Sequence, residues 1–238
     1  YQEDIPANEI ENWAIVQSER FKNMVIRGFH TELEAVYEEY NRGLASDTWK
    51  IFENLNRLLF PNHPYGQQTT IGTQEHLKNP SIVNIENYFR KYYVPNNMAI
   101  CMSGDLDPEA TIRIIKQYFG DWQPGDTIVP RQFEPEAPLD KPVVKDIYGL
   151  EQEMVVLGWR LPGRKDSEWD KADVMNAVLN NDKSGLIDID LNQQQRVLEA
   201  SCFALGMTDY SEFIMVGIPK DGQTLDQVKD LLLEEVDD

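Results

Sequence analysis

A proline-rich stretch at residues 123–142 is the feature of this 238-residue chain that most constrains its fold. It holds five of the chain's 13 prolines and shows almost no helical or strand periodicity. Proline lacks a backbone N–H and fixes φ, so such a stretch continues neither a helix nor a central strand. We therefore expect an extended linker between two domains rather than one continuous domain.

The segment before this linker has mainly helical patterns, because apolar side chains recur every three or four residues along most of it. The predicted helices cover residues 8–26, 31–44 and 49–59, a stretch after Ser81, and a stretch that starts with Asp107 as N-cap and Pro108 in the first turn. One apolar run, residues 98–102, is predicted to be a strand.

The segment after the linker mixes strands with helices. The predicted strands cover residues 143–148, 154–161, 198–205 and 212–219, and the predicted helices cover 167–179, 191–196 and the residues from Thr224 onward. Long helices and short strands without regular alternation are typical of an α+β fold, in which helices pack on mainly antiparallel sheets.

The charge of the chain limits its partners. It has 22 Lys and Arg against 41 Asp and Glu, which gives a net charge of -19. Such a chain repels a polyanion, so we exclude nucleic acid and favour a cationic or neutral partner. No stretch approaches the ~18 uninterrupted apolar residues of a membrane-spanning helix, so we expect no membrane-spanning segment.

The chain has no self-contained catalytic motif. Its three histidines, His30, His63 and His76, do not form the His-x-x-Glu-His zinc motif. His63 lies in a His-Pro-Tyr-Gly turn, which favours a structural role. Cys101 and Cys202 lie in apolar runs and are expected to be buried. We expect no catalytic residue within these 238 residues.

Two glutamates on one predicted helix are the remaining candidates. Glu32 and Glu39 are seven residues apart, and seven steps of ~100° come within ~20° of two full turns, so both side chains project from one face. Charged groups that are partly buried usually pair or bind a metal. In a chain with 41 acidic residues, however, this spacing alone is more typical of a solvated helix flank.

A series of distinctive segments gives these glutamates a context. The segments are FHTELEAVYEEYNR at 29–42, His63-Pro64-Tyr65-Gly66, Ile71-Gly72-Thr73, YFRKYYVPNNM at 88–98, Ser103-Gly104-Asp105 and Tyr118-Phe119-Gly120. Their order and spacing over about residues 18–122 resemble the pitrilysin/insulinase (M16) family of zinc metallopeptidases. From residue 143 the resemblance is weaker, and the run at 156–162 is similar to the opening strand of the next domain in that family.

The resemblance implies a fold and a division of the chain. We expect two partial M16-type (LuxS/MPP-like) domains: the C-terminal half of the catalytic domain at 1–122, the linker at 123–142, and the N-terminal part of the second domain at 143–238. The sequence starts without Met and ends within a helical pattern, so we expect an internal fragment that pairs with the missing halves of its own domains.

The resemblance also implies roles for the two glutamates. Glu39 matches the distal zinc ligand of the family, and Glu32 matches the acidic residue that supports the site one heptad earlier. The two His ligands and the general-base Glu belong to an upstream His-x-x-Glu-His segment that this sequence lacks. The expected function is that of a fragment of a zinc-dependent metalloendopeptidase, inactive alone, which hydrolyses peptides in a clamshell chamber. Its zinc site would be incomplete here.

A second reading of the resemblance is a non-catalytic M16-fold subunit with a structural or partner-binding role. Such a subunit keeps the fold without the zinc ligands. The presence of both Glu32 and Glu39 favours the enzyme, because a subunit without metal has no need of that pair.

Overall fold

The computed structural model describes residues 1–237, which pack as two compact units. The first unit comprises Tyr1–Glu38 and Thr73–Phe133, and the second comprises Glu39–Gly72 and the chain from Glu134 onward. These units describe packing, and the domain boundaries expected from the sequence stay predictions. Among the described residues, no helix is long and apolar enough to cross a membrane.

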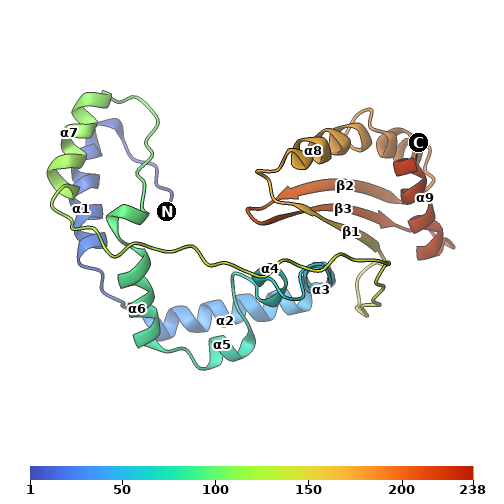
Figure 1. The fold of residues 1–238 in the computed structure, drawn as a ribbon, viewed down its shortest axis with the longest axis horizontal. Helices are drawn as coiled ribbons and strands as arrows, with labels where there is room; N and C mark the ends of the chain where they lie inside the picture. Colours follow the sequence, from blue (N-terminus) through green and yellow to red (C-terminus); the bar gives the residue numbers. More distant parts are fainter. Residues whose placement is uncertain (238) are drawn as a thin grey trace. The chain divides into compact units, whose positions relative to one another are not determined.

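The first unit is helical (Figure 1). Its helices are α1 (Ile10–Lys22), the beginning of α2 (Phe29–Ala45), α5 (Gln74–Lys78), α6 (Ile82–Tyr92) and α7 (Pro108–Phe119), with short 3₁₀ turns at Ala7–Glu9 and Pro95–Asn97. Asp107 caps α7 as predicted, because its side chain accepts a hydrogen bond from the N–H of Ala110 at 2.7 Å.

Helices α1 and α7 pack against each other through aromatic rings. The rings of Trp13 and Phe119 are 6.1 Å apart, and Phe21 stacks on Trp122 at 6.4 Å. Lys22 closes the end of this pair by donating a hydrogen bond to the carbonyl of Tyr118 at 2.6 Å. The periodic apolar positions in these helices therefore form their mutual contact.

The strand predicted at residues 98–102 is wrong. These residues form no helix or strand, and no backbone hydrogen bond joins residues 99–103 to another described segment. A strand is stable only when it pairs with a neighbour. The apolar run alone therefore did not suffice to predict one.

The second unit is built on a three-stranded antiparallel sheet with the order β1-β3-β2. Its elements are α3 (Asp47–Leu59), α4 (Pro64–Gln67), β1 (Val155–Pro162), α8 (Ser167–Leu179), a π-helical segment (Ile187–Gln193), β2 (Glu199–Gly206), β3 (Tyr210–Ile218) and α9 (Leu225–Asp237). Helices therefore pack on an antiparallel sheet, as the sequence predicted.

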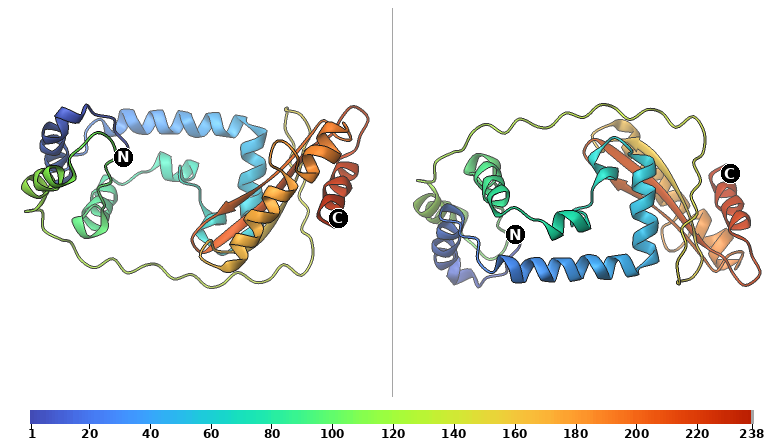
Figure 2. Two further views of the ribbon diagram at one scale, coloured as in Figure 1. Left: turned by 90° about the horizontal axis from the view of Figure 1, so that it is seen from above. Right: turned by 90° about the horizontal axis from the view of Figure 1, so that it is seen from below.

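One face of this sheet carries the main core. Helices α8 and α9 and the π-helical segment cover it (Figures 1 and 2). The buried side chains there include Leu179, Ile187, Leu191, Phe213, Met215, Val228 and Leu232. The opposite face packs on α3, where Leu55 contacts Gly158 and the ring of Phe52 lies 6.2 Å from that of Phe203. The sheet thus lies between two helical layers.

The proline-rich stretch 123–142 has neither helix nor strand, as predicted. Its part from Glu134 onward belongs to the second unit, so this part is packed rather than free. The strand predicted at 143–148 is wrong, because these residues pair with no strand among the described ones, and Val144 and Tyr148 are exposed.

Candidate functional site

Helix α2 carries both candidate glutamates. It begins at Phe29, directly after Gly28, which has a positive φ of 62°. Its partly buried stripe includes Leu33, Val36 and Tyr40. Glu32 and Glu39 lie on this one continuous helix, as predicted, and both residues are exposed rather than partly buried. The boundary between the two compact units falls after Glu38, so the second unit includes Glu39.

Neither candidate carboxylate is bound by another side chain among the described residues. Glu32 and Glu39 form no side-chain hydrogen bond or ion pair with any residue in the described part of the chain. A carboxylate engaged in a structural ion pair is not available to a metal, and these two are available. Their arrangement fits both a metal ligand with a supporting acid and a solvated helix flank.

A zinc ion requires more donors than α2 provides. Catalytic zinc takes three protein ligands, commonly His with one carboxylate. Within residues 1–237, no group of three or more His, Cys, Asp or Glu side chains is arranged to hold a metal. Glu39 has the chemistry of one ligand, but the described residues do not form a zinc site by themselves.

Two of the three histidines, His63 and His76, have local structural roles. His76 completes a capping box at the start of α5, where its Nδ1 accepts from the N–H of Thr73 at 3.4 Å. His63 is buried and caps α4, where its Nδ1 accepts from the N–H of Tyr65 at 3.3 Å. Its Nε2 lies 3.4 Å from Oδ2 of Asp209. This agrees with the structural role predicted for the His-Pro-Tyr-Gly turn.

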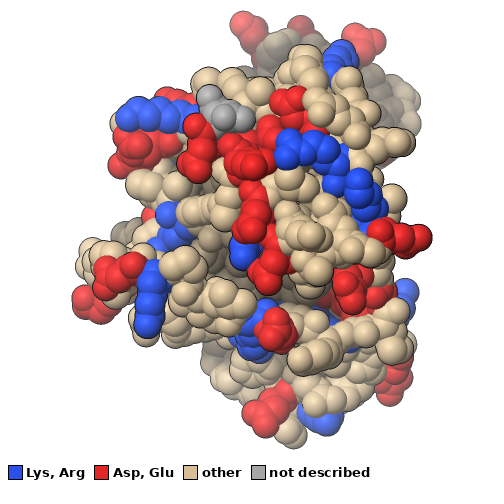
Figure 3. Space-filling view, turned by 90° about the vertical axis from the view of Figure 1, so that its right-hand side faces the viewer, with Lys and Arg blue, Asp and Glu red and all other residues tan. Residues whose placement is uncertain are grey.

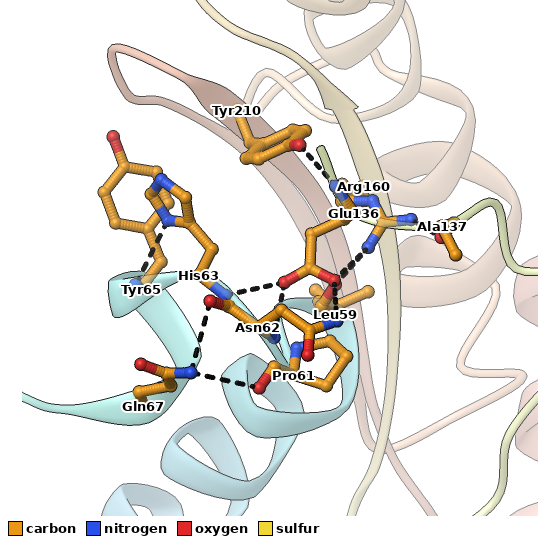
Figure 4. Close-up of polar contacts among 10 residues, drawn as sticks. All are labelled: Leu59, Pro61, Asn62, His63, Tyr65, Gln67, Glu136, Ala137, Arg160 and Tyr210. Atoms are coloured by element: carbon orange, nitrogen blue, oxygen red, sulfur yellow. Dashed lines mark hydrogen bonds and ion pairs between the residues drawn. The ribbon is translucent and has the colours of Figure 1, made fainter. Parts of the chain in front are cut away.

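A buried polar cluster surrounds His63, and its centre is Glu136 (Figure 4). The Glu136 carboxylate accepts hydrogen bonds from the backbone N–H groups of Asn62 and His63, both at 2.7 Å, and from the Asn62 amide at 3.1 Å. The N–H of Glu136 donates to the hydroxyl of Tyr210 at 2.8 Å. Sequence reasoning missed Glu136, because an aperiodic proline-rich stretch gives no signal for a long-range contact.

Arg160 joins this cluster to β1. Its guanidinium donates to the carbonyl of Leu59 at 2.6 Å and to that of Ala137, and it lies 3.8 Å from the Glu136 carboxylate. Trp159 points to the opposite face of the sheet, where its ring lies 5.9 Å from Phe213. Arg160 is therefore a partly buried residue that joins β1 to the α3 side of the sheet.

Glu212 is a second buried carboxyl on this side of the sheet. It is 2% exposed, and its Oε1 has no hydrogen-bond partner among the described residues. Burial raises the pKa of Glu212 to about 7. Its register partner on β1 is Arg160, although no ion pair joins the two side chains. Glu212 therefore titrates near neutral pH within the fold.

The two cysteines differ. Cys202 is buried as predicted, and burial raises the pKa of its thiol to about 12, so it stays protonated at neutral pH. Cys101 is exposed, so the prediction that it is buried is wrong. It lies in the 98–102 run, which packs against no partner strand. Neither thiol has a described metal-ligand cluster around it.

The fold and the family comparison define the class of this protein. The family model described as "Peptidase M16 inactive domain" matches residues 83–238, about two thirds of the chain. The chain therefore belongs to the peptidase M16 family, as the segments from 29 to 120 predicted.

Particular relatives are named proteases. The chain is 24% identical over 158 residues to "Zinc protease PqqE" of Helicobacter pylori, an alignment that covers 65% of this chain and 35% of that protein. The crystal structure of a protease from Helicobacter pylori has a TM-score of 0.79 at 19% identity, and covers 97% of this chain and 56% of that one. A chain of Complex III2 from Candida albicans has a TM-score of 0.75 at 15% identity, with 97% and 57% covered. The chain thus spans between about a third and somewhat more than half of the length of these relatives.

Proposed function

We propose that this chain is part of a zinc-dependent metalloendopeptidase, to which it contributes Glu39 as one metal ligand and Glu32 as a supporting acid. The observation that carries the proposal is the state of these glutamates: both are exposed on one helix, and neither carboxylate is engaged by a described residue. The helix lies in the segment that resembles the family's second zinc helix. The curated relative is itself named a zinc protease.

The roles of the residues follow from this arrangement. Glu39 would hold the metal through a carboxylate oxygen, and Glu32, two turns earlier, would act on the site through its charge. The two histidines and the general base would come from polypeptide outside these 238 residues. Bound zinc supplies Lewis-acid activation of the attacking water and of the peptide carbonyl. This chain alone is therefore expected to cleave nothing.

The proposed substrates are peptides held in a chamber between halves of the parent protein. The net charge of -19 suits basic or neutral peptides if acidic side chains line that chamber. Acidic side chains are spread over the face in Figure 3 with Lys and Arg between them, so this face offers no continuous basic surface for phosphates.

The test uses a polypeptide that extends this chain to the family's His-x-x-Glu-His segment. Glu39→Gln should remove most of the bound zinc, because an amide is a poor substitute for a carboxylate ligand. Glu32→Gln should leave much of the zinc but reduce peptide hydrolysis by about 10–100-fold, as is typical of groups that support a ligand. Full zinc content and full activity in both variants would contradict the assignment.

A second candidate function is that of a non-catalytic, partner-binding M16-fold subunit. Two observations favour it: the matching family model describes an inactive domain, and a chain of Complex III2 has a similar fold. Zinc-free, inactive parent protein that co-purifies with a stable partner subunit would support this candidate over the peptidase.

A further inference from the structure

The second unit fixes the part of α2 that carries Glu39. Only residues 39–45 of this helix belong to that unit, and they lead through Ser46 into α3. We propose that the second unit has a definite task, which is to position this helix end, and that Asp47 is the positioning residue. The proposal rests on the function proposed above for Glu39.

The corner between α2 and α3 is tightly packed. The indole of Trp49 lies against Gly43, where a methyl group would be only 3.2 Å from Cδ2 of the indole. The N–H of Ser46 donates to the carbonyl of Gly43 at 3.1 Å, and the Ser46 hydroxyl accepts from the N–H of Trp49 at 3.3 Å. Gly43 is one helical turn after Glu39, so a shift of α3 moves the helix end that carries Glu39.

Asp47 attaches this corner to the chain that precedes β1. Its Oδ2 accepts hydrogen bonds from the backbone N–H groups of Leu150 at 2.6 Å and Glu151 at 2.7 Å, and its own N–H lies 3.3 Å from the Glu151 carboxylate. A side chain at Gly149 would overlap the Asp47 carboxylate. We call these contacts of Asp47 with residues 149–151 the clasp.

The clasp is a buried set of hydrogen bonds rather than a surface ion pair. Asp47 is only 7% exposed, and Oδ1 accepts a further hydrogen bond from Nζ of Lys50 at 2.8 Å. The Lys50 ammonium and the two backbone N–H groups hold the pKa of Asp47 below its usual range. The carboxylate is thus ionised at neutral pH, when its hydrogen bonds to the turn are strongest.

The other end of α3 is attached as well. Arg160 of β1 binds the carbonyl of Leu59, and Glu136 binds the N–H groups of the turn that follows (Figure 4). In the middle of the helix, Leu55 packs closely on Gly158. A methyl group at Gly158 would lie only 2.7 Å from Cδ1 of Leu55. Helix α3 is therefore fixed to the sheet along its length, and the clasp fixes the end that joins α2.

Hydrogen exchange of this chain tests the structural step. Asp47→Ala should speed amide exchange in residues 40–50 by about tenfold or more, because two backbone bonds to a charged group are lost. Asp47→Asn keeps an oxygen acceptor for residues 150 and 151 and should restore most of the protection. Asp107→Ala, which removes the cap of α7 in the other unit, should leave residues 40–50 unchanged. Unchanged exchange in Asp47→Ala would overturn the proposal.

Zinc affinity of the extended polypeptide, measured by chelator competition, tests the functional step. Asp47→Ala should weaken zinc binding by about tenfold, Asp47→Asn should largely restore it, and Asp107→Ala should not change it. Suppose that Glu39→Gln loses zinc, and that Asp47→Ala exchanges faster but binds zinc as tightly as wild type. This result would overturn the positioning role of Asp47. If Glu39→Gln leaves zinc binding unchanged, the proposed function fails instead, and the exchange result alone decides whether the clasp holds the helix.

Discussion

Single carboxylates have very different tasks in this chain, and their surroundings decide which. Glu39 is exposed and has no described partner, whereas Glu136 is buried and its carboxylate accepts from Asn62 and His63. Glu212 is buried without such donors, so burial raises its pKa instead. Residue type alone therefore predicts neither a ligand nor a structural anchor in a chain with 41 acidic residues.

Removal of the Glu136 carboxylate should strongly destabilise the second unit. Glu136→Ala leaves the backbone N–H groups of Asn62 and of the buried His63 without an acceptor and removes the carboxylate that lies 3.8 Å from Arg160, so we expect a loss of about 3 kcal/mol in the free energy of unfolding. Urea unfolding measures this loss. Glu134→Ala, an exposed neighbour, is the control and should change stability by less than about 0.5 kcal/mol. Equal stability of the two variants would contradict the role of Glu136.

The buried Glu212 should give a pH dependence of stability with a defined sign. Its pKa in the folded state, about 7, lies above the ordinary value of 4.5, so the folded state binds the proton more tightly than the unfolded state. This group therefore contributes stability at low pH, and the contribution is lost as pH rises from about 4.5 to about 7.

The test compares Glu212→Gln with wild type by urea unfolding at several pH values. The neutral amide lacks the titration, so the variant should be about as stable as wild type near pH 5 and clearly more stable at pH 8. Other titrating groups contribute equally to both proteins and cancel in the difference. A difference that does not change with pH would mean that Glu212 is not the titrating group.

At the scale of elements, helices were predictable and strand pairing was not. The periodic stripes of α1, α3, α7 and α8 and the Asp107 cap are local features, so the sequence was sufficient to locate them. The runs at 98–102 and 143–148 have the composition of strands but no described partner strand. Glu32 and Glu39 could be placed on one face because one helix carries both. The roles of Glu136, Arg160 and Asp47 could not be predicted, since each also binds a backbone group more than seventy residues away in the chain.

A larger side chain should be most destabilising at a glycine that lets a helix lie close to the sheet. Gly217 of β3 lies so close to Val228 of α9 that a methyl group would overlap its side chain. Gly217→Ala should therefore destabilise the second unit by about 1–3 kcal/mol. In a double-mutant cycle, Val228→Ala makes room for the added methyl, so the double variant should lose less stability than the sum of the single variants. Additive losses would show that the two residues do not compete for space.

The chain belongs to the M16 family, and it spans 35% of the zinc protease and 56% of the protease structure to which it is similar. A catalytic centre that includes Glu39 is therefore a proposal, because its other ligands would come from polypeptide outside these 238 residues. In that centre, α2 would bring Glu39 to the metal, and the clasp at Asp47 would hold it there.

Zinc content shows whether Glu39 is a metal ligand. It should be measured by elemental analysis of the extended polypeptide as wild type, as Glu39→Gln, and as Glu38→Gln, which changes the neighbouring exposed glutamate on a different side of α2. We predict one zinc ion per wild-type and per Glu38→Gln chain, and a large loss of zinc in Glu39→Gln alone. Undiminished zinc in Glu39→Gln would contradict the assignment of Glu39 as a metal ligand.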